Sequence, residues 1–497
     1  MQEIGYQFLI KLFNLDVLTP YKRCFATTAS TKSKETSWSA EIEYFPSSYM
    51  KEMTWQNNLV FALKYEGVNL HILKEFFKKI DKKELCAFIK SKKTSVLLRR
   101  IWFYYEFLME EKLDIPPVSS GNYDYALPKD KYFTFISNQY EYLRRQRLYN
   151  NMPGNPSFCP IVYLTKKNQK EMRIDLKEVT QKLIAEYPSE LLYRAARYLY
   201  VKETKSSYAI EHQTPDQKRQ AGFITLLEQA GKNPLTKEYL IKLQNLITDA
   251  RFANNDYRKD QVYVGQSLAP GNELIHFIGV KPSDLDNIMA AYFQAYDRLL
   301  NSNSNPVIMA AVFSFMFVFI HPFNDGNGRL HRYLLHHILA AKKITPENII
   351  FPVSAVLYKK ALQYDQMLES FSKRVMEHIE YDLDENGEMN VKNETIDYYR
   401  YINLTRIVES FFDILDETIH TELSAELKYL LSWDNIRSEL KKVVDLPEKE
   451  TLLLISLMQQ NGGDLSKNKR KNFSFLTDEE LIAISQIVKK ELFSQSH

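Results

Sequence analysis

The chemistry of this chain is concentrated in residues 321–332, which read His-Pro-Phe-Asn-Asp-Gly-Asn-Gly-Arg-Leu-His-Arg. Gly326 and Gly328 allow a tight turn and bring bare backbone N–H groups, together with that of Asn327, close to a ligand. Residues 330–341 have the pattern of a helix, so these N–H groups are expected at a helix N-terminus, where anions bind well. The stretch therefore predicts an anion site.

Four side chains of the same stretch suit a phosphate-bearing substrate. Arg329 and Arg332 lie three residues apart, roughly one helical turn, and their planar guanidinium groups match phosphate oxygens. Asp325 is an oxygen ligand for a magnesium ion that already carries phosphates. His321 is the group that can take up a proton near neutral pH. Together they predict transfer of a phosphate-bearing group to a nucleophile.

Two other metal sites are excluded by spacing. A calcium loop needs acidic ligands at alternate positions and a closing glutamate, but Gly328 is followed by Arg, Leu, His and Arg. Zinc ligands on one helix need a spacing of three or four residues. His331, His336 and His337 are spaced by five, six and one, so we predict that they are surface or packing residues.

Length and composition indicate an ordinary globular protein of two or three domains. The 497 residues are 45% hydrophobic and 26% charged, and the net charge of +3 is too small to predict a nucleic-acid partner on charge alone. The cysteines at 24, 86 and 159 have no metal spacing, and the start lacks a secretory signal pattern, so we expect a cytoplasmic protein. The apolar run 307–320 is too short to span a bilayer; we expect no membrane partner and interpret the run as a buried helix that leads into His321.

The order of patterns along the chain predicts four parts. Residues 1–115 are expected to form a mostly helical domain, and residues 116–175, rich in Pro, Gly and Asn, a linker and connecting segment. Residues 176–400 are expected to form a helical core, in which residues 261–278 read as two short strands around a turn. Residues 401–497 are expected to form a C-terminal helical module, compatible with a winged helix and therefore with DNA binding.

The twelve residues from His321 resemble the motif of the Fic family, His-x-Phe-x-Asp/Glu-Gly-Asn-Gly-Arg-x-x-Arg, and every fixed position is matched. The resemblance implies a mainly α fold with a helical Fic core, a short β-hairpin called the flap, and helical accessory domains at both ends. In the family the flap holds the target protein as an added strand. The flap residues carried over to this chain are Val262, Tyr263, Val264, Ile275, His276 and Phe277.

Many Fic proteins also carry an inhibitory helix with the pattern Ser/Thr-x-x-x-Glu-Gly/Asn, whose glutamate pairs with the second arginine of the motif. Residues 206–212 resemble it, with Ser207 and Glu211 in place and His212 departing from the usual Gly or Asn. A competing match is Ala62-Leu-Lys-Tyr-Glu-Gly, which would make Glu66 the inhibitory residue. Its distance from the motif favours Glu211, which lies 321 − 211 = 110 residues upstream of His321, against 321 − 66 = 255 for Glu66.

The resemblance implies a protein adenylyltransferase that moves AMP from ATP to a Ser, Thr or Tyr hydroxyl of a target protein, with Mg²⁺ as cofactor and self-inhibition by a glutamate. His321 is implied as the base. Two alternatives stay open: a hydrolase that removes AMP at the same site, and a nucleotide-sensing regulator that binds DNA through its C-terminal module. The sequence is also compatible with self-modification and with a homodimer.

Overall fold

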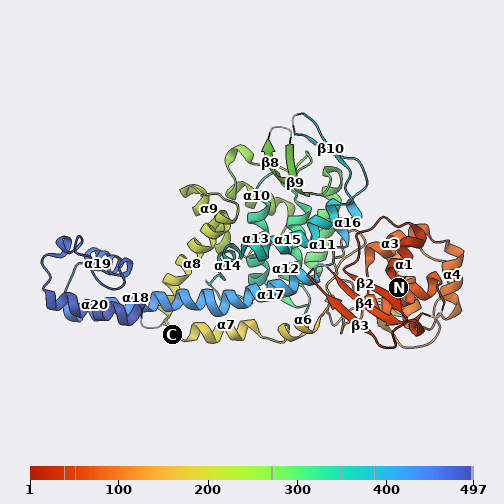
Figure 1. The fold of residues 1–497 in the computed structure, drawn as a ribbon, viewed down its shortest axis with the longest axis horizontal. Coiled ribbons are helices and arrows are strands. Elements are labelled where there is room, and N and C mark those ends of the chain that lie inside the picture. Colours follow the sequence, from red (N-terminus) through yellow and green to blue (C-terminus); the bar gives the residue numbers. More distant parts are fainter. Residues whose placement is uncertain (39, 51, 270–271, 348, 386, 494–497) are drawn as a thin grey trace.

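The computed structural model describes residues 1–497 except 39, 51, 270–271, 348, 386 and 494–497; side chains of residues 267–273 are likewise outside the description. The chain is mainly helical with small separate sheets, which confirms the predicted class. Three parts follow one another along the long axis: the N-terminal part, a central helical core and a C-terminal arm (Figure 1). The predicted C-terminal boundary at His497 lies outside the described residues.

The N-terminal part combines helices with a sheet that the sequence did not predict. Its helices are α1 (Tyr6–Phe13), α2 (Trp55–Phe61), α3 (Leu70–Lys79), α4 (Lys82–Ser91) and α5 (Val96–Met109). Its four strands, in the order β1-β2-β4-β3, are β1 (Gln2–Ile4), β2 (Lys22–Thr27), β4 (Glu41–Pro46) and β3 (Ser33–Thr36). Each strand is at most six residues long, and β2 and β4 bury only two residues each, so the period of two is too brief to stand out.

Residues 116–175 are packed, which corrects the prediction of a linker. Leu127, Leu148 and Met152 are fully buried in the same hydrophobic core as α3 and α5. The segment contains only the short strands β5 (Asp124–Tyr125), β6 (Glu141–Leu143) and β7 (Leu148–Asn150) and the helix α6 (Lys166–Glu171). The buried Asn151 side chain bonds both backbone groups of Leu127, at 2.9 and 2.7 Å, in place of a strand partner. Pro, Gly and Asn interrupt helices in this segment, but its apolar side chains can still be buried because its backbone groups are hydrogen-bonded.

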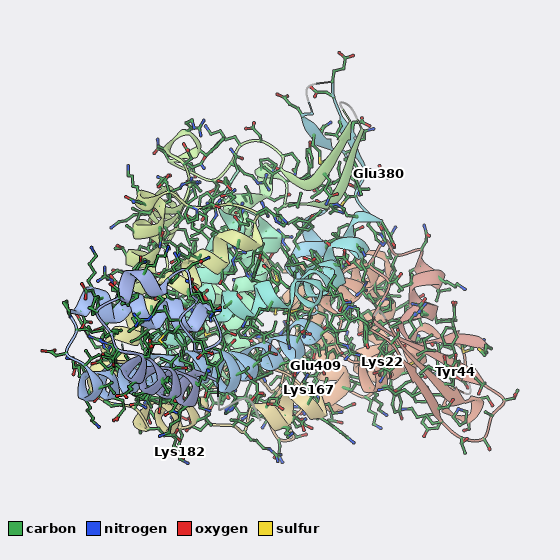
Figure 2. The ribbon with its side chains drawn as sticks, turned by 60° about the vertical axis from the view of Figure 1, so that its left-hand side comes forward. Lys22, Tyr44, Lys167, Lys182, Glu380 and Glu409 are labelled. Atoms are coloured by element: carbon green, nitrogen blue, oxygen red, sulfur yellow. The ribbon has the colours of Figure 1, made fainter. Side chains whose placement is uncertain are left out.

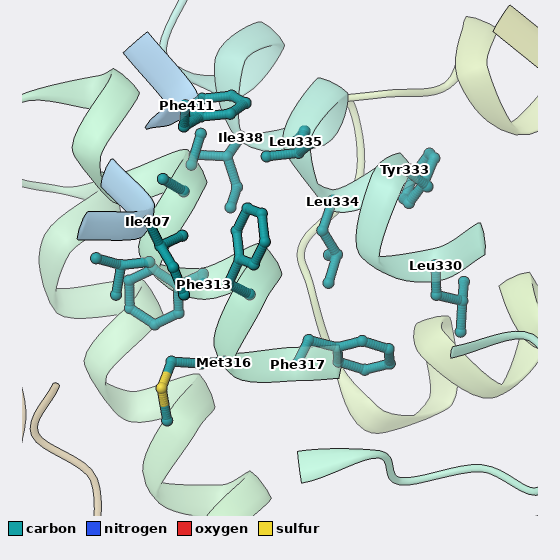
Figure 3. Close-up of a cluster of buried hydrophobic side chains, with 14 of the residues drawn as sticks. Phe313, Met316, Phe317, Leu330, Tyr333, Leu334, Leu335, Ile338, Ile407 and Phe411 are labelled. Atoms are coloured by element: carbon teal, nitrogen blue, oxygen red, sulfur yellow. The ribbon is translucent and has the colours of Figure 1, made fainter. Parts of the chain in front are cut away.

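Helix α12 (Pro306–Ile320) is the centre of the core. It is buried on almost all sides, as predicted for the run that leads into His321. Figure 3 shows Phe313 and Met316 of α12 among side chains of α13 (Asn327–Ala341) and α17 (Thr405–Glu417), including Ile338, Ile407 and Phe411. Because α17 closes this core, the predicted boundary at residue 400 does not coincide with a break in packing.

The remaining core helices surround α12 and α13. They are α7 (Leu176–Ala185), α8 (Ser189–Ile210), α9 (Gln217–Glu228), α10 (Lys237–Ile247), α11 (Pro282–Leu300), α14 (Val353–Lys359), α15 (Ala361–Met376) and α16 (Ile396–Arg400). The predicted hairpin is present as β8 (Tyr263–Ala269) antiparallel to β9 (Asn272–Ile278), and its tip at residues 270–271 lies outside the described residues. A second hairpin, β10 (Tyr381–Leu383) with β11 (Met389–Val391), stands near the first (Figure 1).

The C-terminal arm is helical and has a small core of its own. After η4 (Thr418–Leu423), helix α18 (Ser424–Val443) leaves the central core and packs with α19 (Glu448–Gln460) and α20 (Asp478–Leu492) around Ile436, Leu454 and Ile484. No strand is present among the described residues 401–493, so the wing of a winged helix is missing from them. The independent core therefore begins near residue 436.

None of the helices within the described ranges is both long enough and apolar enough to cross a membrane.

We predict that Ile407→Ala destabilises the central core and Leu454→Ala only the arm. Both residues are almost fully buried, and each truncation is expected to lower the free energy of unfolding of its own unit by about 2–5 kcal/mol. Hydrogen exchange in increasing urea separates the units, because exchange in α12 reports on the core and exchange in α20 on the arm. Faster exchange in α20 but not in α12 after Ile407→Ala would place α17 in the arm.

Candidate active site

His321 lies at the end of α12, where the helix must stop. It adopts the left-handed conformation (φ 57°, ψ 61°), and its N–H still donates to the Phe317 carbonyl at 3.0 Å. Nδ1 lies 3.1 Å from the Val318 carbonyl oxygen, which assigns the proton to Nδ1 and leaves Nε2 as the acceptor. Burial, followed by the charge of Arg258, lowers the pKa of His321 to about 4. The ring is therefore neutral at pH 7 and able to accept a proton.

Arg258 holds the backbone of His321 and Pro322, a role the sequence did not reveal. The side chain is 3% exposed; Nε donates to the His321 carbonyl at 2.8 Å, and the other guanidinium nitrogens donate to the carbonyls of Asp260 and Val280. Its backbone N–H donates to the Pro322 carbonyl at 3.0 Å. Contacts between one arginine and four backbone groups leave no local sequence pattern. The only signal in the sequence was the position of Arg258 at the entrance of the hairpin.

The loop between His321 and α13 is closed from inside by Asn327. The Asn327 side chain accepts from the Phe323 N–H at 3.0 Å and donates to the Phe323 carbonyl at 2.6 Å. Its amide is thus occupied and 2% exposed, so only its backbone N–H is available at the start of α13. Gly326 precedes the helix with φ +88°, and a Cβ there would lie 2.8 Å from Thr248. Glycine is required at this turn for both reasons.

Arg329 and Arg332 are buried side by side and share one carboxylate, that of Glu211. Arg332 donates from Nη2 to Glu211 Oε1 at 2.7 Å, and Arg329 Nε forms an ion pair with Glu211 Oε2 at 2.8 Å. The two arginine side chains are 0% and 2% exposed, whereas that of Glu211 is 24% exposed. The expected pairing with Arg332 is present; the additional pairing with Arg329 was not predicted. Burial lowers the pKa of Arg329, but Glu211 and Asp325 more than offset it and leave the pKa raised.

Ser207 and His212 complete this end of α8. Arg332 Nε donates to Ser207 Oγ at 2.8 Å, and Nη2 donates to the Ser207 carbonyl at 2.8 Å. Glu211 is the C-cap of α8, and His212 adopts φ 54°, the left-handed conformation that Gly or Asn takes most easily. The departure at His212 is thus accommodated without changing how the helix ends.

Gly328 explains how Glu211 comes so close to the start of α13. A Cβ at this position would lie 2.4 Å from Glu211 Oε1 and 3.2 Å from Arg332 Nη1. The carboxylate therefore occupies the space in front of the first turn of α13, where backbone N–H groups and two guanidinium groups converge. This is the position in which an anion binds most favourably.

Asp325 is suited to a cation that brings phosphates with it. Its Oδ1 accepts from the Gly326 N–H and from Arg329 Nη2, both at 2.7 Å, and its side chain is 34% exposed. Within the described part of the chain there is no group of three or more His, Cys, Asp or Glu side chains able to hold a metal ion. A single accessible carboxylate fits Mg²⁺, which commonly takes one or two carboxylates and obtains its other ligands from water and phosphate.

Comparison with known proteins identifies the region just described. A model of the Fic/DOC family matches residues 234–339, from the start of α10 almost to the end of α13. Residues 234–339 thus carry a Fic/DOC domain. The matched stretch contains the hairpin, Arg258 and the whole loop from His321 to Arg332; Ser207 and Glu211 lie upstream of it.

The curated relatives match this chain over about a fifth of its length. The protein adenylyltransferases Fic of Drosophila sechellia and Drosophila melanogaster are each 37% identical over 101 residues, which is 20% of this chain and 17% of the relative. That of Drosophila willistoni is 34% identical over 97 residues. The chain thus spans about a sixth of the length of the relatives it matches.

Two solved structures show partial similarity to this chain. A Fic family protein from Desulfovibrio desulfuricans G20 gives a TM-score of 0.40 at 18% identity, covering 63% of this chain and 90% of that one. A Fic domain containing signaling protein from Bacteroides thetaiotaomicron VPI-5482 gives a TM-score of 0.36 at 18% identity, covering 52% and 97%.

The predicted flap residues of the Fic domain divide into two groups. Val264 and His276 are exposed, and Val262, Tyr263 and Ile275 are half-buried. Phe277 is 7% exposed and packs on Phe319, Phe371, Tyr399 and the ring of His321, whose centroid is 6.4 Å away. Phe277 therefore packs against His321 on the buried side of the hairpin. Because alternate residues of a strand face opposite sides, its side chain is not free to contact a target.

The competing glutamate lies elsewhere. Glu66 is 7% exposed in the N-terminal part, where Oε2 accepts from the Tyr6 N–H at 2.7 Å. Burial raises the pKa of Glu66 to about 8. It contacts neither arginine, so among the two candidates only Glu211 reaches the site.

The three histidines of α13 were expected to be either surface or packing residues, and the structure shows that they are packing residues. His331, His336 and His337 are at most 2% exposed. His331 lies against Phe315 and Tyr364, and burial, then the charge of Arg332, lowers its pKa to about 3. Burial lowers the pKa of His337 to about 4.

We predict that acid destabilises the Fic core through these buried histidines. The folded-state pKa of His331 lies below the value of about 6.5 expected in the unfolded chain, so below pH 6.5 the unfolded state binds more protons and stability is lost as pH falls. Between pH 6 and 4, His331→Phe should reduce the slope of unfolding free energy against pH by up to about 1.4 kcal/mol per pH unit. Urea titrations across this range measure the slope.

The matched control is His420→Phe, since the His420 side chain is 54% exposed. The slope of His331→Phe is compared with the slope of this variant. An equal slope for His331→Phe would show that His331 titrates normally in the folded state.

Proposed function

We propose that the chain is a protein adenylyltransferase that moves AMP from ATP to a hydroxyl side chain of a target protein and is inhibited by Glu211. The observation that carries this proposal is the carboxylate of Glu211 on two buried arginines at the start of α13. Buried guanidinium groups at a helix N-terminus suit the outer phosphates of a nucleotide. The adenylyltransferase names of the curated relatives support AMP as the group transferred.

In the proposed reaction the hydroxyl oxygen of the target forms a bond to the α-phosphorus of ATP, and the bond from this phosphorus to the bridging oxygen of the β-phosphate breaks. The hydroxyl proton passes to Nε2 of His321, and pyrophosphate leaves. The N–H groups of residues 327 and 328 hold phosphate oxygens, and Arg329 and Arg332 stabilise the charge on the leaving group. Bound at Asp325, Mg²⁺ would supply further positive charge to the phosphates.

The same charges explain the proposed inhibition. A carboxylate 2.7–2.8 Å from both guanidinium groups removes the positive charge that the outer phosphates need and repels those phosphates. A displaced α-phosphate loses alignment with the hydroxyl, and a misplacement of about 1 Å can lower a rate about a hundredfold. Inhibition would thus act on geometry and charge without blocking His321.

The hairpin is the proposed contact for the target. β8 and β9 form a sheet of two strands, so each has an outer edge, and the exposed Val264 and His276 lie on them. A target segment that adds as a strand would bring its hydroxyl toward His321, which lies beside Phe277. DNA is not part of this proposal, because the described C-terminal residues lack the strands of a winged helix.

We predict that Glu211→Gly converts an almost inactive protein into one that labels itself with AMP in the presence of Mg²⁺ and ATP. Intact-mass spectrometry should detect one added adenylyl group in Glu211→Gly and none in Glu211→Gly/His321→Ala. The gain over the unchanged protein should be about a hundredfold or more in rate, since alignment is restored. A target-independent readout is provided by pyrophosphate release.

The matched control is Glu190→Gly, which makes the same change at an exposed glutamate in the first turn of α8. It should leave the mass unchanged. No labelling and no pyrophosphate from Glu211→Gly would refute the transferase. Release of AMP from a modified target by the unchanged protein, lost in Glu211→Gly, would instead establish the hydrolase.

The pH dependence of kcat/KM for Glu211→Gly, which lacks the inhibitory carboxylate, should reflect the pKa of the buried His321. Because its pKa is lowered to about 4, the ring remains unprotonated and competent as a base well below neutrality. The kcat/KM of Glu211→Gly should therefore stay flat from pH 7.5 to about 5 and fall only toward pH 4. A fall centred near pH 6.5 would show that His321 titrates as if it were exposed.

A further inference from the structure

A second carboxylate of α8 is buried one helical turn before Ser207. Glu203 is 0% exposed, and its Oε1 lies 2.7 Å from Nε2 of His336 on α13. Its Oε2 accepts from the Ser354 N–H at 2.8 Å, and the Ser354 hydroxyl donates to Oε1. A carboxylate this deeply buried is stable only when its hydrogen bonds are satisfied. Nothing in the proposed reaction uses it.

Glu203 is the far end of a ladder between α8 and α13. Going back along α8 from Glu211, the contacts on α13 advance: Glu211 binds Arg329 and Arg332, Ser207 binds Arg332, and Glu203 meets His336. Each step is about one turn on both helices, so the two helices run antiparallel in a single register. Slippage of α8 by one turn breaks all of these contacts together.

The opposite side of the same turn forms ion pairs with η4 and the first turn of α18, where the chain leaves the central core for the C-terminal arm. Lys202 forms ion pairs with Glu422 of η4 and Glu426 of α18, and Glu422 also pairs with Lys359 of α14 at 2.5 Å. The side chains of Glu422 and Glu426 are 6% and 13% exposed, so these pairs are screened less than surface pairs. Residues 202–203 are therefore held from both sides.

We propose that Glu203 is a positioning residue for the inhibitory carboxylate, and that Lys202 links this position to the C-terminal arm. Glu203 fixes the register in which Glu211, two turns further along α8, reaches the arginines. Movement of α18 relative to the core would loosen the same turn and release Glu211. The proposal rests on the proposed function, because it assigns a control point to the inhibition at Glu211.

The test combines each change with the presence or absence of Glu211. Glu203→Gln keeps the size of the side chain but replaces charged hydrogen bonds by weaker neutral ones. We expect at least about tenfold more self-labelling with AMP than in the unchanged protein, a factor that corresponds to about 1.4 kcal/mol in favour of released α8. Glu203→Ala and Lys202→Met should also raise labelling. In the Glu211→Gly background none of the three should raise it further.

A purely structural role gives a different pattern. Damage to the fold lowers labelling in both backgrounds, and a gain that persists in Glu211→Gly shows an action elsewhere; either result overturns the proposal. The matched control is Glu409→Gln, the same change at a glutamate that is 8% exposed and bonded to Thr165 and Arg406. Glu409 lies beside Lys167 where α6 meets α17 (Figure 2), and its change should leave labelling as it is.

Hydrogen exchange separates failure of this proposal from failure of the proposed function. Glu203→Gln should accelerate amide exchange in residues 204–213 and leave α12 unchanged, whether or not the protein transfers AMP. If Glu211→Gly is inactive but Glu203→Gln accelerates exchange, the transferase is refuted and the role of Glu203 in positioning α8 is supported. If Glu211→Gly is active while Glu203→Gln changes neither labelling nor exchange, the positioning role is refuted alone.

Discussion

Two guanidinium groups buried at the N-terminus of α13 are the constraint on which the rest of the structure depends. Arg329 and Arg332 lie in a region that already carries the positive end of a helix dipole, and neither can lose its proton. A folded chain must therefore bring anionic or carbonyl oxygen to them. Here Glu211, Asp325, the Ser207 hydroxyl and backbone carbonyls do so. The same requirement makes the site attractive to phosphate, so in the proposed function inhibition and substrate binding compete for one place.

The position of these arginines follows from packing behind them. Helices α12 and α13 form one antiparallel unit in the core, and α17 covers it from the other side (Figure 3). The turn between the two helices has little freedom, because the Asn327 side chain bonds the Phe323 backbone within the turn and Arg258 donates to the His321 carbonyl. His321 is held between them with Nε2 left as the acceptor. Rigid support of this kind is what a reaction that depends on alignment requires.

Much of the site could be predicted from the sequence, because its residues are close together and each has a restrictive chemistry. His321, Asp325, the two glycines and the arginines lie within twelve positions, and the helix on each side is evident from apolar periodicity. Ser207 and Glu211 were found by pattern and distance, and both contact Arg332. Arg258, Glu203 and the second partner of Glu211 were missed, since each depends on residues far apart in the chain. The N-terminal sheet and the packed segment 116–175 were missed because short strands and irregular chain leave no lasting period.

The sequence by itself determined the helical class, the hairpin and the chemical character of the loop, since these depend on local periodicity, glycine and the side-chain types present. The distance from the motif favoured Glu211 over Glu66, but only the tertiary structure shows that Glu211 contacts the arginines and that Glu66 lies in another part of the fold. It also decided that Phe277 supports His321, that Asn327 faces inward and that α17 belongs to the core. The physical reason is the same in each case: burial and long-range pairing depend on which surfaces meet, and that information is spread over the whole chain.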